Sequence, residues 1–260
     1  GVALVRETRG LWQVLCAAPS YDAFVSAAFD APTDWQENRF RGSEPDIHLL
    51  LEAARELGTT PVDVIAMDIP LAHTRITGRR PSDLAISKAF GGKGCSTHSP
   101  NSTRPGRISN SLVRQLKDNG FHLDTAASAP EGAPRAIEVY PHPALLKLLN
   151  RDYRVPYKVG NSSKNWRGDA VQQRIARLID EFTSIYRGLT EALGKLPFDL
   201  PSPNHVASLS FLKRYEDALD ALVCAWVGLQ HSLRRTRAFV DEDSALWVPE
   251  ETFGFTDAGV

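Results

Sequence analysis

The stretch Val62-Asp-Val-Ile-Ala-Met-Asp-Ile69 is β-branched and almost continuously apolar, and Pro70 follows it. A strand that is apolar on both faces is typical of a sheet that helices cover on both sides, whereas a strand with one solvated face alternates. Proline cannot donate a ladder hydrogen bond, so it ends such a strand. The stretch therefore predicts a central buried strand that carries Asp68 near its carboxyl end.

The segments around this strand predict a mixed sheet. Residues 1–5 and 11–17 are short β-prone runs joined by a polar turn, which indicates an antiparallel hairpin. Residues 135–140 form a second strand, halted by Pro141, and residues 245–248 form a last short one. Helices are expected at 20–29, 49–57, 82–90, 111–120, 144–149, 169–193 and 205–235, the last of them with a possible break near Arg214. This order predicts one α/β domain over 1–260, with the hairpin first and helices on both faces of the sheet.

Composition restricts the class of protein. The 260 residues are 42% hydrophobic and 23% charged, which is ordinary for a globular domain with a full core. The net charge of -1 gives no overall attraction to nucleic acid or membranes, so any attraction must come from local patches. The 3 cysteines are scattered without a C-x-x-C pair, which favours a reducing cytoplasm over a disulfide framework or a cysteine zinc site. The longest apolar run, 218–229, is too short to span a bilayer.

Four acidic residues stand out by their positions. Asp68 lies near the end of the buried strand, and Glu138 occupies a matching place in the strand 135–140. Asp217 and Asp220 are three residues apart, so a helix places both carboxylates on one face. We expect these four side chains to converge, because function in open α/β sheets gathers at the carboxyl ends of strands.

The helix that carries the pair is predicted to pack tightly. Ala221, Cys224 and Gly228 continue the face of the two aspartates, and these small residues let a helix lie close to a sheet. Residues 218–229 are apolar almost all round, which indicates a buried helix. Two like charges that enter a buried helix repel each other and favour a cation between them.

Each acid also has a structural interpretation. Asp68 is able to cap the turn at Pro70, and Glu138 to face solvent on an edge strand. Asp217 and Asp220 would be favoured by the dipole if they lay in the first turn of a helix. Taken together, however, the four oxygen donors suit Mg²⁺ or Mn²⁺ better than zinc. We therefore predict Asp68, Asp217 and Asp220 as metal ligands and catalytic residues, with Glu138 as a further ligand or base.

Six motifs carry a resemblance to a known family. They are Val-Ile-Ala-Met-Asp68-Ile-Pro-Leu, Arg80-Pro-Ser-Asp83, Ile137-Glu-Val-Tyr-Pro141, Pro156-Tyr-Lys158, Asp217-Ala-Leu-Asp220-Ala-Leu-Val-Cys-Ala-Trp226 and Ala245-Leu-Trp-Val-Pro249. The set resembles a largely uncharacterised family of predicted nucleases with a ribonuclease-H-like fold, over roughly 62–249. The fold resemblance extends to bacterial Holliday-junction resolvases.

This resemblance implies roles and one departure. It makes Asp68 the acid of the fourth strand, Asp217 and Asp220 the helical pair, and Glu138 an additional family acid. Such sites also need an aspartate in a first strand before the hairpin, and no acid of this chain occupies that place. Because Met67 is the sole methionine, Gly1 is not a translation start, and we expect the first strand to lie upstream of Gly1.

A basic segment follows Asp68. Residues 71–110 are rich in Gly, Ser and Thr and hold a local excess of cations, which is typical of a loop that grips phosphates or, alternatively, of a solvated surface insertion. The resemblance adds Lys158 as a phosphate contact, whereas His73, His98 and His142 are expected at turn or surface positions. The predicted substrate-binding residues are Arg75, Arg79, Arg80, Lys93, Arg104, Arg107 and Lys158.

These observations predict metal-dependent phosphodiester hydrolysis of DNA or RNA, with Mg²⁺ or Mn²⁺ as cofactor and no membrane partner. Two alternatives remain open. The first is a nucleic-acid-binding or scaffold protein with a degenerate site, which would bind in a salt-dependent way without turnover. The second is a small-molecule phosphotransferase or phosphatase on the same fold, for which no glycine-rich nucleotide fingerprint is present.

Overall fold

The computed structural model describes residues 1–36, 40–125 and 132–250. The segment between the helix expected at 111–120 and the strand expected at 135–140 therefore lies partly outside the described residues. The strands are β1 (Val2–Thr8), β2 (Leu11–Ala18), β3 (Val64–Met67), β4 (His122–Leu123), β5 (Arg135–Val139), β6 (Thr236–Val240) and β7 (Ala245–Pro249). The helices are α1 (Tyr21–Phe29), α2 (Ile47–Gly58), α3 (Pro81–Phe90), α4 (Arg107–Asp118), α5 (Pro141–Leu148), α6 (Ser162–Asn165), α7 (Val171–Leu193) and α8 (Leu209–Ser232), with the 3₁₀ turns η1 (Gly91–Lys93), η2 (Val159–Asn161) and η3 (Pro203–His205).

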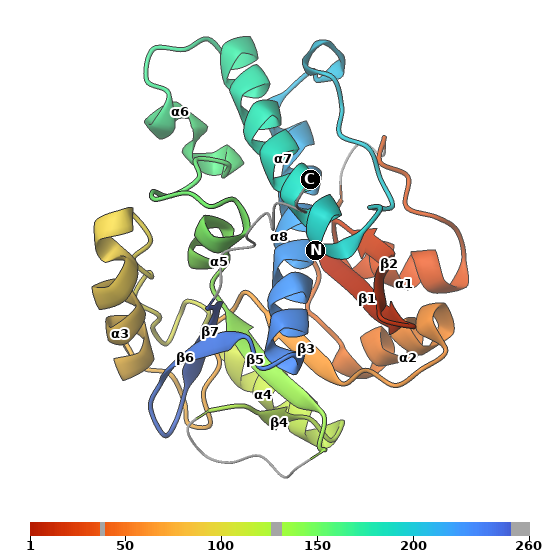
Figure 1. Ribbon diagram of the computed structural model, residues 1–260, viewed down its shortest axis with the longest axis vertical. Helices are drawn as coiled ribbons and strands as arrows, with labels where there is room; N and C mark the ends of the chain where they lie inside the picture. The colour runs from red at the N-terminus through yellow and green to blue at the C-terminus, as the bar shows by residue number, and fades with distance from the viewer. Residues whose placement is uncertain (37–39, 126–131, 251–260) are drawn as a thin grey trace, which may run out of the picture.

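The strands form a hairpin and a separate five-stranded mixed sheet (Figure 1). The larger sheet has the order β3-β5-β7-β6, and β4 pairs with β5 beside the first half of that strand. Only β6 is antiparallel to its neighbour. The register sets Met67 opposite Glu138, so the carboxyl ends of β3 and β5 lie at the same edge of the sheet.

The predicted hairpin is confirmed. Strands β1 and β2 pair antiparallel, and the residues between them, Arg9 and Gly10, both have positive φ, at 56° and 79°. Two left-handed residues match the right-handed twist of paired strands, which is why such tight turns favour glycine. The helix expected at 20–29 is α1, which begins after Ser20, and the hydroxyl of Ser20 caps it by accepting a hydrogen bond from the Ala23 amide at 3.1 Å.

Helices cover both faces of β3. Val64 and Ala66 pack on the side of α8, whereas Ile65 and Met67 pack on the side of α2 and α4. A β-carbon added at Gly228 of α8 would lie 3.3 Å from the Ala66 β-carbon, so glycine lets this helix lie directly on the strand. The predicted close packing of the small helix face against the sheet is therefore confirmed.

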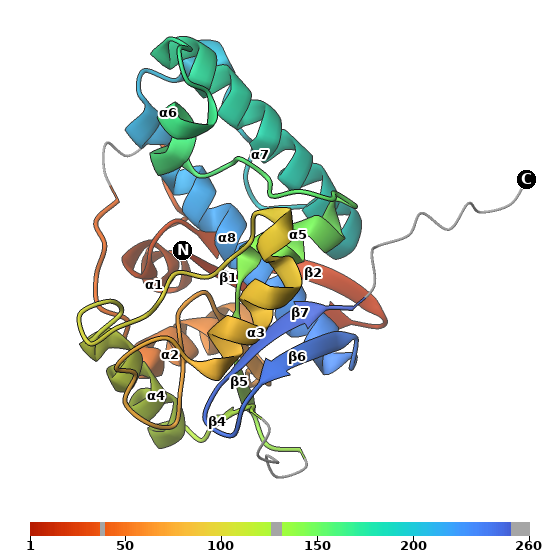
Figure 2. The same ribbon diagram turned by 90° about the vertical axis from the view of Figure 1, so that its left-hand side faces the viewer.

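Some elements differ from expectation. Helix α8 continues unbroken through Arg214, and α4 begins at Arg107, so the basic loop is shorter than predicted. Strands β4 and β6 were not predicted; β6 pairs with β7, and α3 covers both strands (Figure 2). Among the described residues, no helix has the length and apolar character needed to cross a membrane.

Candidate functional site

A cavity of about 840 Å³ lies between the hairpin, β3 and α8. Its lining includes Asp68, at the carboxyl end of β3, and both Asp217 and Asp220 of α8. The three predicted metal ligands therefore border one cavity, although they come from segments about 150 residues apart in the sequence. The parallel register of the sheet brings Asp68 to this edge, and the contact of α8 with β3 brings the helical pair beside it.

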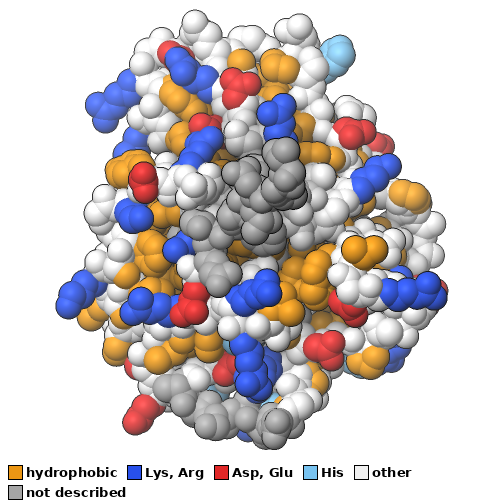
Figure 3. Space-filling view, viewed as in Figure 1, with side chains coloured by type: hydrophobic (Ala, Val, Ile, Leu, Met, Phe, Trp, Pro, Cys, Tyr) orange, Lys and Arg blue, Asp and Glu red, His pale blue; other side chains and the backbone are white. Residues whose placement is uncertain are grey.

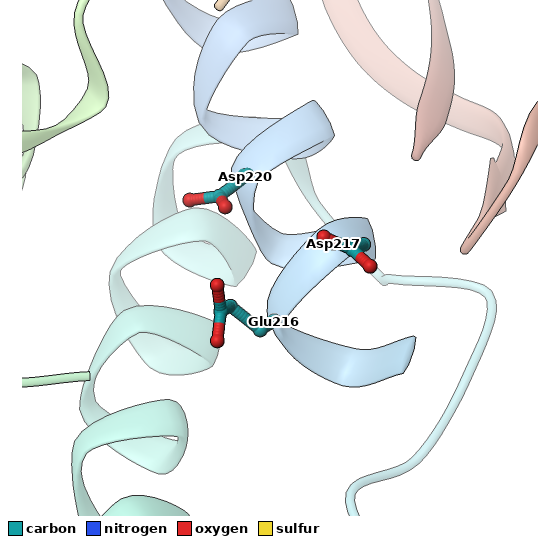
Figure 4. A group of neighbouring side chains, drawn as sticks. All are labelled: Glu216, Asp217 and Asp220. Carbon is teal, nitrogen blue, oxygen red and sulfur yellow. The ribbon is translucent and has the colours of Figure 1, made fainter. Parts of the chain in front are cut away.

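Three carboxylates of α8 form a tight group. Glu216, Asp217 and Asp220 each offer an oxygen, and these oxygens all lie within 4.8 Å of one another. Figure 4 shows the Glu216 and Asp220 carboxylates one turn apart, with Asp217 on another side of the helix. Ligands around one Mg²⁺, at bonds of about 2.0–2.1 Å, sit roughly 3–4 Å apart, so small side-chain rotations suffice to share an ion. Glu216 was missed by the sequence analysis, although its spacing of four residues from Asp220 places both on one helix face.

Two lysines compensate the charge of this group. Lys158 donates to Asp220 and lies 3.7 Å from Glu216 Oε1. Lys213 donates to Glu216 at 2.8 Å and to Asp217 at 2.6 Å. Burial alone would lower the pKa of Lys158, but the neighbouring carboxylates, Asp220 foremost, raise it above its usual value. Both lysines therefore remain charged, and their ammonium groups offset the negative charge of the three carboxylates.

Asp68 differs from these carboxylates. Within the described part of the chain it has no hydrogen bond or ion pair, and its side chain keeps access to solvent through the cavity. Desolvation by the surrounding protein raises the pKa of Asp68 to about 7, and the charge of Asp220 adds to this effect against the opposing lysines. An unpartnered carboxyl beside a second carboxylate is a site where a cation would be stabilising.

Glu138 does not join this group. Its carboxylate is 3% exposed and accepts hydrogen bonds from Arg80 at 2.6 and 2.7 Å and from the Leu71 amide at 2.7 Å. Arg80 also binds Asp83, so the guanidinium is fully engaged in a buried network. The expectations that Glu138 is a ligand or base and that Arg80 grips phosphate are not supported by this arrangement, because neither group faces the cavity.

This buried network is ionised. Burial alone would lower the pKa of Arg80, but hydrogen bonds to Glu138 and Asp83 raise it. Burial also raises the pKa of Glu138, whereas the hydrogen bonds and the charge of Arg80 lower it. Because Arg80 keeps its proton and donates twice to Glu138, the pair is charged at neutral pH.

The loop cations lie away from the acids. Arg75, Arg79, Lys93, Arg104 and Arg107 are exposed, and none of them lines the cavity. Arg79 donates to Ser87 of α3 at 2.7 Å, and the Lys93 carbonyl accepts from the Arg154 amide at 2.9 Å. Of the predicted phosphate contacts, the structure thus brings only Lys158 to the acidic group among the described residues.

His142 is buried rather than at the surface. Its side chain is 4% exposed, and its Nε2 lies 2.6 Å from a guanidinium nitrogen of Arg154. Burial lowers the pKa of His142 to about 2, and the charges of Arg154 and Lys158 lower it further. The ring is therefore neutral in the folded protein, with Nε2 accepting the hydrogen bond from Arg154.

This neutral histidine makes stability depend on pH. The unfolded chain takes up a proton near pH 6.5 that the folded chain does not bind until about pH 2, so we expect His142 to lower the free energy of unfolding by about 1.4 kcal/mol per pH unit below pH 6. Urea unfolding from pH 7.5 to pH 5, compared with His142→Gln, measures this contribution. The free energy of unfolding of the variant should change less steeply with pH, by the equivalent of one bound proton. Parallel pH profiles of the two proteins would contradict a neutral His142 in the folded state.

The sequence of this chain matches one known family. Residues 50–245 match the model of DUF429, described as a protein of unknown function. The chain belongs to the DUF429 family. The match spans the segment from α2 to the start of β7, and so includes Asp68 and the acids of α8. No curated protein and no solved structure matches this DUF429 chain.

Proposed function

We propose that this DUF429 protein hydrolyses phosphodiester bonds of nucleic acid with the help of Mg²⁺ or Mn²⁺. The observation that carries the proposal is that the unpartnered carboxyl of Asp68 borders the same cavity as Asp217 and Asp220. The element order supports a ribonuclease-H-like sheet, because a hairpin precedes a mixed sheet that helices cover on both faces. Function is nonetheless argued from the site, since one fold hosts many activities.

The donor set fits a hard divalent cation. Asp68, Asp217 and Asp220 would hold it, and Glu216 lies close enough to contribute an oxygen. Bound ions of this type activate water and neutralise charge at the phosphorus. The two lysines pair with these acids, so the carboxylates already lie among positive charges, and this supports the proposal of a cation there.

The chain supplies further groups for a phosphate. Lys158 pairs with Asp220, and a divalent cation held by that carboxylate would compete for the pairing. The freed ammonium would then be available to a phosphate oxygen as a compact point charge. Tyr157 donates to the other oxygen of Asp220 at 2.6 Å and holds that carboxylate in place. The proposed role of Lys158 is therefore to bind substrate phosphate.

Cleavage of labelled oligonucleotides tests the proposal. Single- and double-stranded DNA and RNA are incubated with full-length protein in Mg²⁺, Mn²⁺ or EDTA. We expect products only with a divalent metal. Salt-dependent binding without turnover would instead favour a degenerate nucleic-acid-binding protein, and turnover of mononucleotides alone would favour a small-molecule phosphatase.

Replacing Lys158, whose ammonium pairs with the acids, tests the proposed metal site without an activity assay. In Lys158→Met, the acids lose one positive charge, so we expect unfolding in EDTA to become easier by about 1.5–3 kcal/mol. Mn²⁺ should then bind at least about tenfold more tightly, as measured by electron paramagnetic resonance, and restore stability. Lys164→Met, at an exposed position of α6, is the matched control. Unchanged Mn²⁺ affinity in Lys158→Met would count against a metal at these carboxylates.

A further inference from the structure

A second cavity lies beside the acidic group. It has a volume of about 580 Å³ and is bordered by the first turns of α8, the beginning of α1 and residues 40–43 of the segment that connects α1 to α2. Figure 2 shows this segment beside the start of α8. Tyr21 and Asp217 line both cavities, so the second cavity adjoins the proposed metal site.

Positive charge dominates the lining of this second cavity. Its charged side chains are three cations and one carboxylate, namely Arg41, Lys213, Arg214 and Asp217. Lys213 already pairs with Asp217 at 2.6 Å, so this carboxylate does not offset the two arginines. On the face that Figure 3 shows, basic and acidic side chains are instead interspersed. The second cavity therefore favours an anion locally, although the net charge of the chain is -1.

Arg41 is available to a ligand. The residue is exposed, and within the described part of the chain its side chain makes no hydrogen bond or ion pair. A guanidinium presents its donors in a planar fork that matches two oxygens of a phosphate. The Ser43 hydroxyl donates to Asp22 at 2.9 Å, which holds this segment against α1. Contacts of its neighbours thus place Arg41 at the cavity, and its own donors remain unused.

Arg214 holds the wall of the cavity in place. It is 6% exposed and donates to the Trp35 carbonyl at 2.7 Å and to the Phe211 carbonyl at 3.0 Å. Its guanidinium carbon lies 4.1 Å from the centroid of the Phe211 ring and 5.1 Å from that of Phe40. The Trp35 ring also stacks on Tyr215, with centroids 5.1 Å apart. These contacts fix the Phe40 ring beside α8, so this wall is formed before a ligand binds.

Two aromatic rings complete the lining. Phe40 and Tyr21 are half-buried, and both border the cavity. Unpaired bases stack on such rings, whereas the bases of a duplex stack on one another and present only their edges. The Tyr21 hydroxyl has no hydrogen bond among the described residues, and burial raises the pKa of Tyr21, so the hydroxyl remains a donor. Aromatic rings and cations that line one groove are typical of proteins that bind single strands.

We propose that this second cavity binds one unpaired nucleotide next to the phosphate at the metal site, so that the substrate is single-stranded nucleic acid or an unpaired end of a duplex. Arg41 binds the phosphate of this nucleotide, and its base lies against Phe40 and Tyr21. The volume suits such a ligand, because cavities of about 300–1,000 Å³ hold small molecules of this size. The inference rests on the proposed function, since the metal site defines which phosphate is cleaved.

Fluorescence anisotropy of labelled oligonucleotides in EDTA, where no cleavage is expected, tests this binding site. The natural protein should bind a short single strand at least about tenfold more tightly than the blunt duplex of the same sequence. Arg41→Ala should weaken binding of the single strand at least about fivefold, and it should reduce the slope of log affinity against log salt concentration by about 0.7, which corresponds to one phosphate contact. Phe40→Leu keeps an apolar side chain but removes the ring, and it should also weaken binding at least about fivefold.

Two exposed residues that line neither cavity provide matched controls. Arg187→Ala in α7 and Phe29→Ala in α1 should bind the single strand as the natural protein does. Thermal unfolding separates lost binding from misfolding. Because the Arg41 side chain makes no hydrogen bond or ion pair within the described residues, Arg41→Ala should unfold at the same temperature as the natural protein.

The outcomes distinguish this inference from the proposed function. If the protein cleaves oligonucleotides but Arg41→Ala and Phe40→Leu bind the single strand normally, the second cavity is not a nucleotide site and the proposed function stands. Equal affinity for duplex and single strand would also overturn the inference. Weaker binding by both variants, without metal-dependent cleavage by the natural protein, would support the nucleotide site and contradict the proposed hydrolysis.

Discussion

Metal-dependent cleavage by the Asp68→Asn variant is expected to be slower than that of the natural protein by about 10²–10⁴-fold. A metal ion contributes several kcal/mol of charge stabilisation in the transition state, and each 1.36 kcal/mol corresponds to a factor of about ten. Asparagine keeps the shape of the side chain but removes the negative charge that would hold the ion. Single-turnover cleavage in Mn²⁺ measures the effect.

Stability separates this loss from misfolding. Asp68 has no hydrogen bond or ion pair in the described chain, so its replacement breaks no such contact and also relieves repulsion from Asp220. Thermal unfolding of Asp68→Asn should therefore match or exceed that of the natural protein. Asp180→Asn, the same substitution at an exposed position of α7, should leave cleavage unchanged. Undiminished activity of Asp68→Asn would remove Asp68 from the mechanism.

The Arg80→Ala variant is expected to lose about 3–5 kcal/mol of unfolding free energy. Arg80 is 6% exposed and ties Glu138, Asp83 and the Leu71 carbonyl together. Its removal leaves two carboxylates buried without a countercharge, which costs far more than the loss of a surface pair. Urea denaturation at pH 7 measures the change.

The neighbouring residue provides the control. Arg79→Ala removes an exposed guanidinium that binds the Ser87 hydroxyl, and it should cost less than about 1 kcal/mol. If Arg80 served the substrate rather than the fold, Arg80→Ala would keep its stability and raise the KM for nucleic acid instead. That result would contradict the structural role assigned here.

Local patterns predicted the elements that position the site. The apolar run that ends at Asp68 predicts a buried strand, and the Asp-x-x-Asp spacing places two carboxylates on one face of a buried helix. In both cases the periodicity of the element indicates which residues share a face. Two such elements meet wherever the sheet and its covering helices pack. This is why Asp68, Asp217 and Asp220 were predicted to lie together, and they border one cavity.

Glu138 shows what the sequence does not reveal. Its position in β5 is equivalent to that of a site residue, but its environment is decided by Arg80, which lies 58 residues earlier. The same pairing removes Arg80 from the group of exposed loop cations. Local sequence pattern cannot distinguish a carboxylate without a protein partner from one that pairs with a buried guanidinium, because that difference depends on a long-range contact.

Strand β6 was missed for a different reason. Thr236–Val240 follows α8 after a short turn, and the arginines at its start resemble the basic end of a helix. Its strand conformation depends on pairing with β7, which provides its hydrogen-bonded partner.

Glu216 was missed because the prediction rested on the Asp-x-x-Asp spacing. Residues four apart on a helix are as close to each other as residues three apart, so the same argument applies to Glu216 and Asp220.

The contact between Gly228 and Ala66 sets the angular position of the acids on α8. Asp220 lies eight residues before this anchor, about 12 Å along the helix axis. Inserting one residue between them would turn the carboxylates by about 100° and carry them out of the cavity, while every hydrophobic residue after the insertion kept its place. The number of residues between Gly228 and Asp220 therefore determines the site geometry. Only insertions or deletions close to a whole helical turn would keep the carboxylates at the cavity.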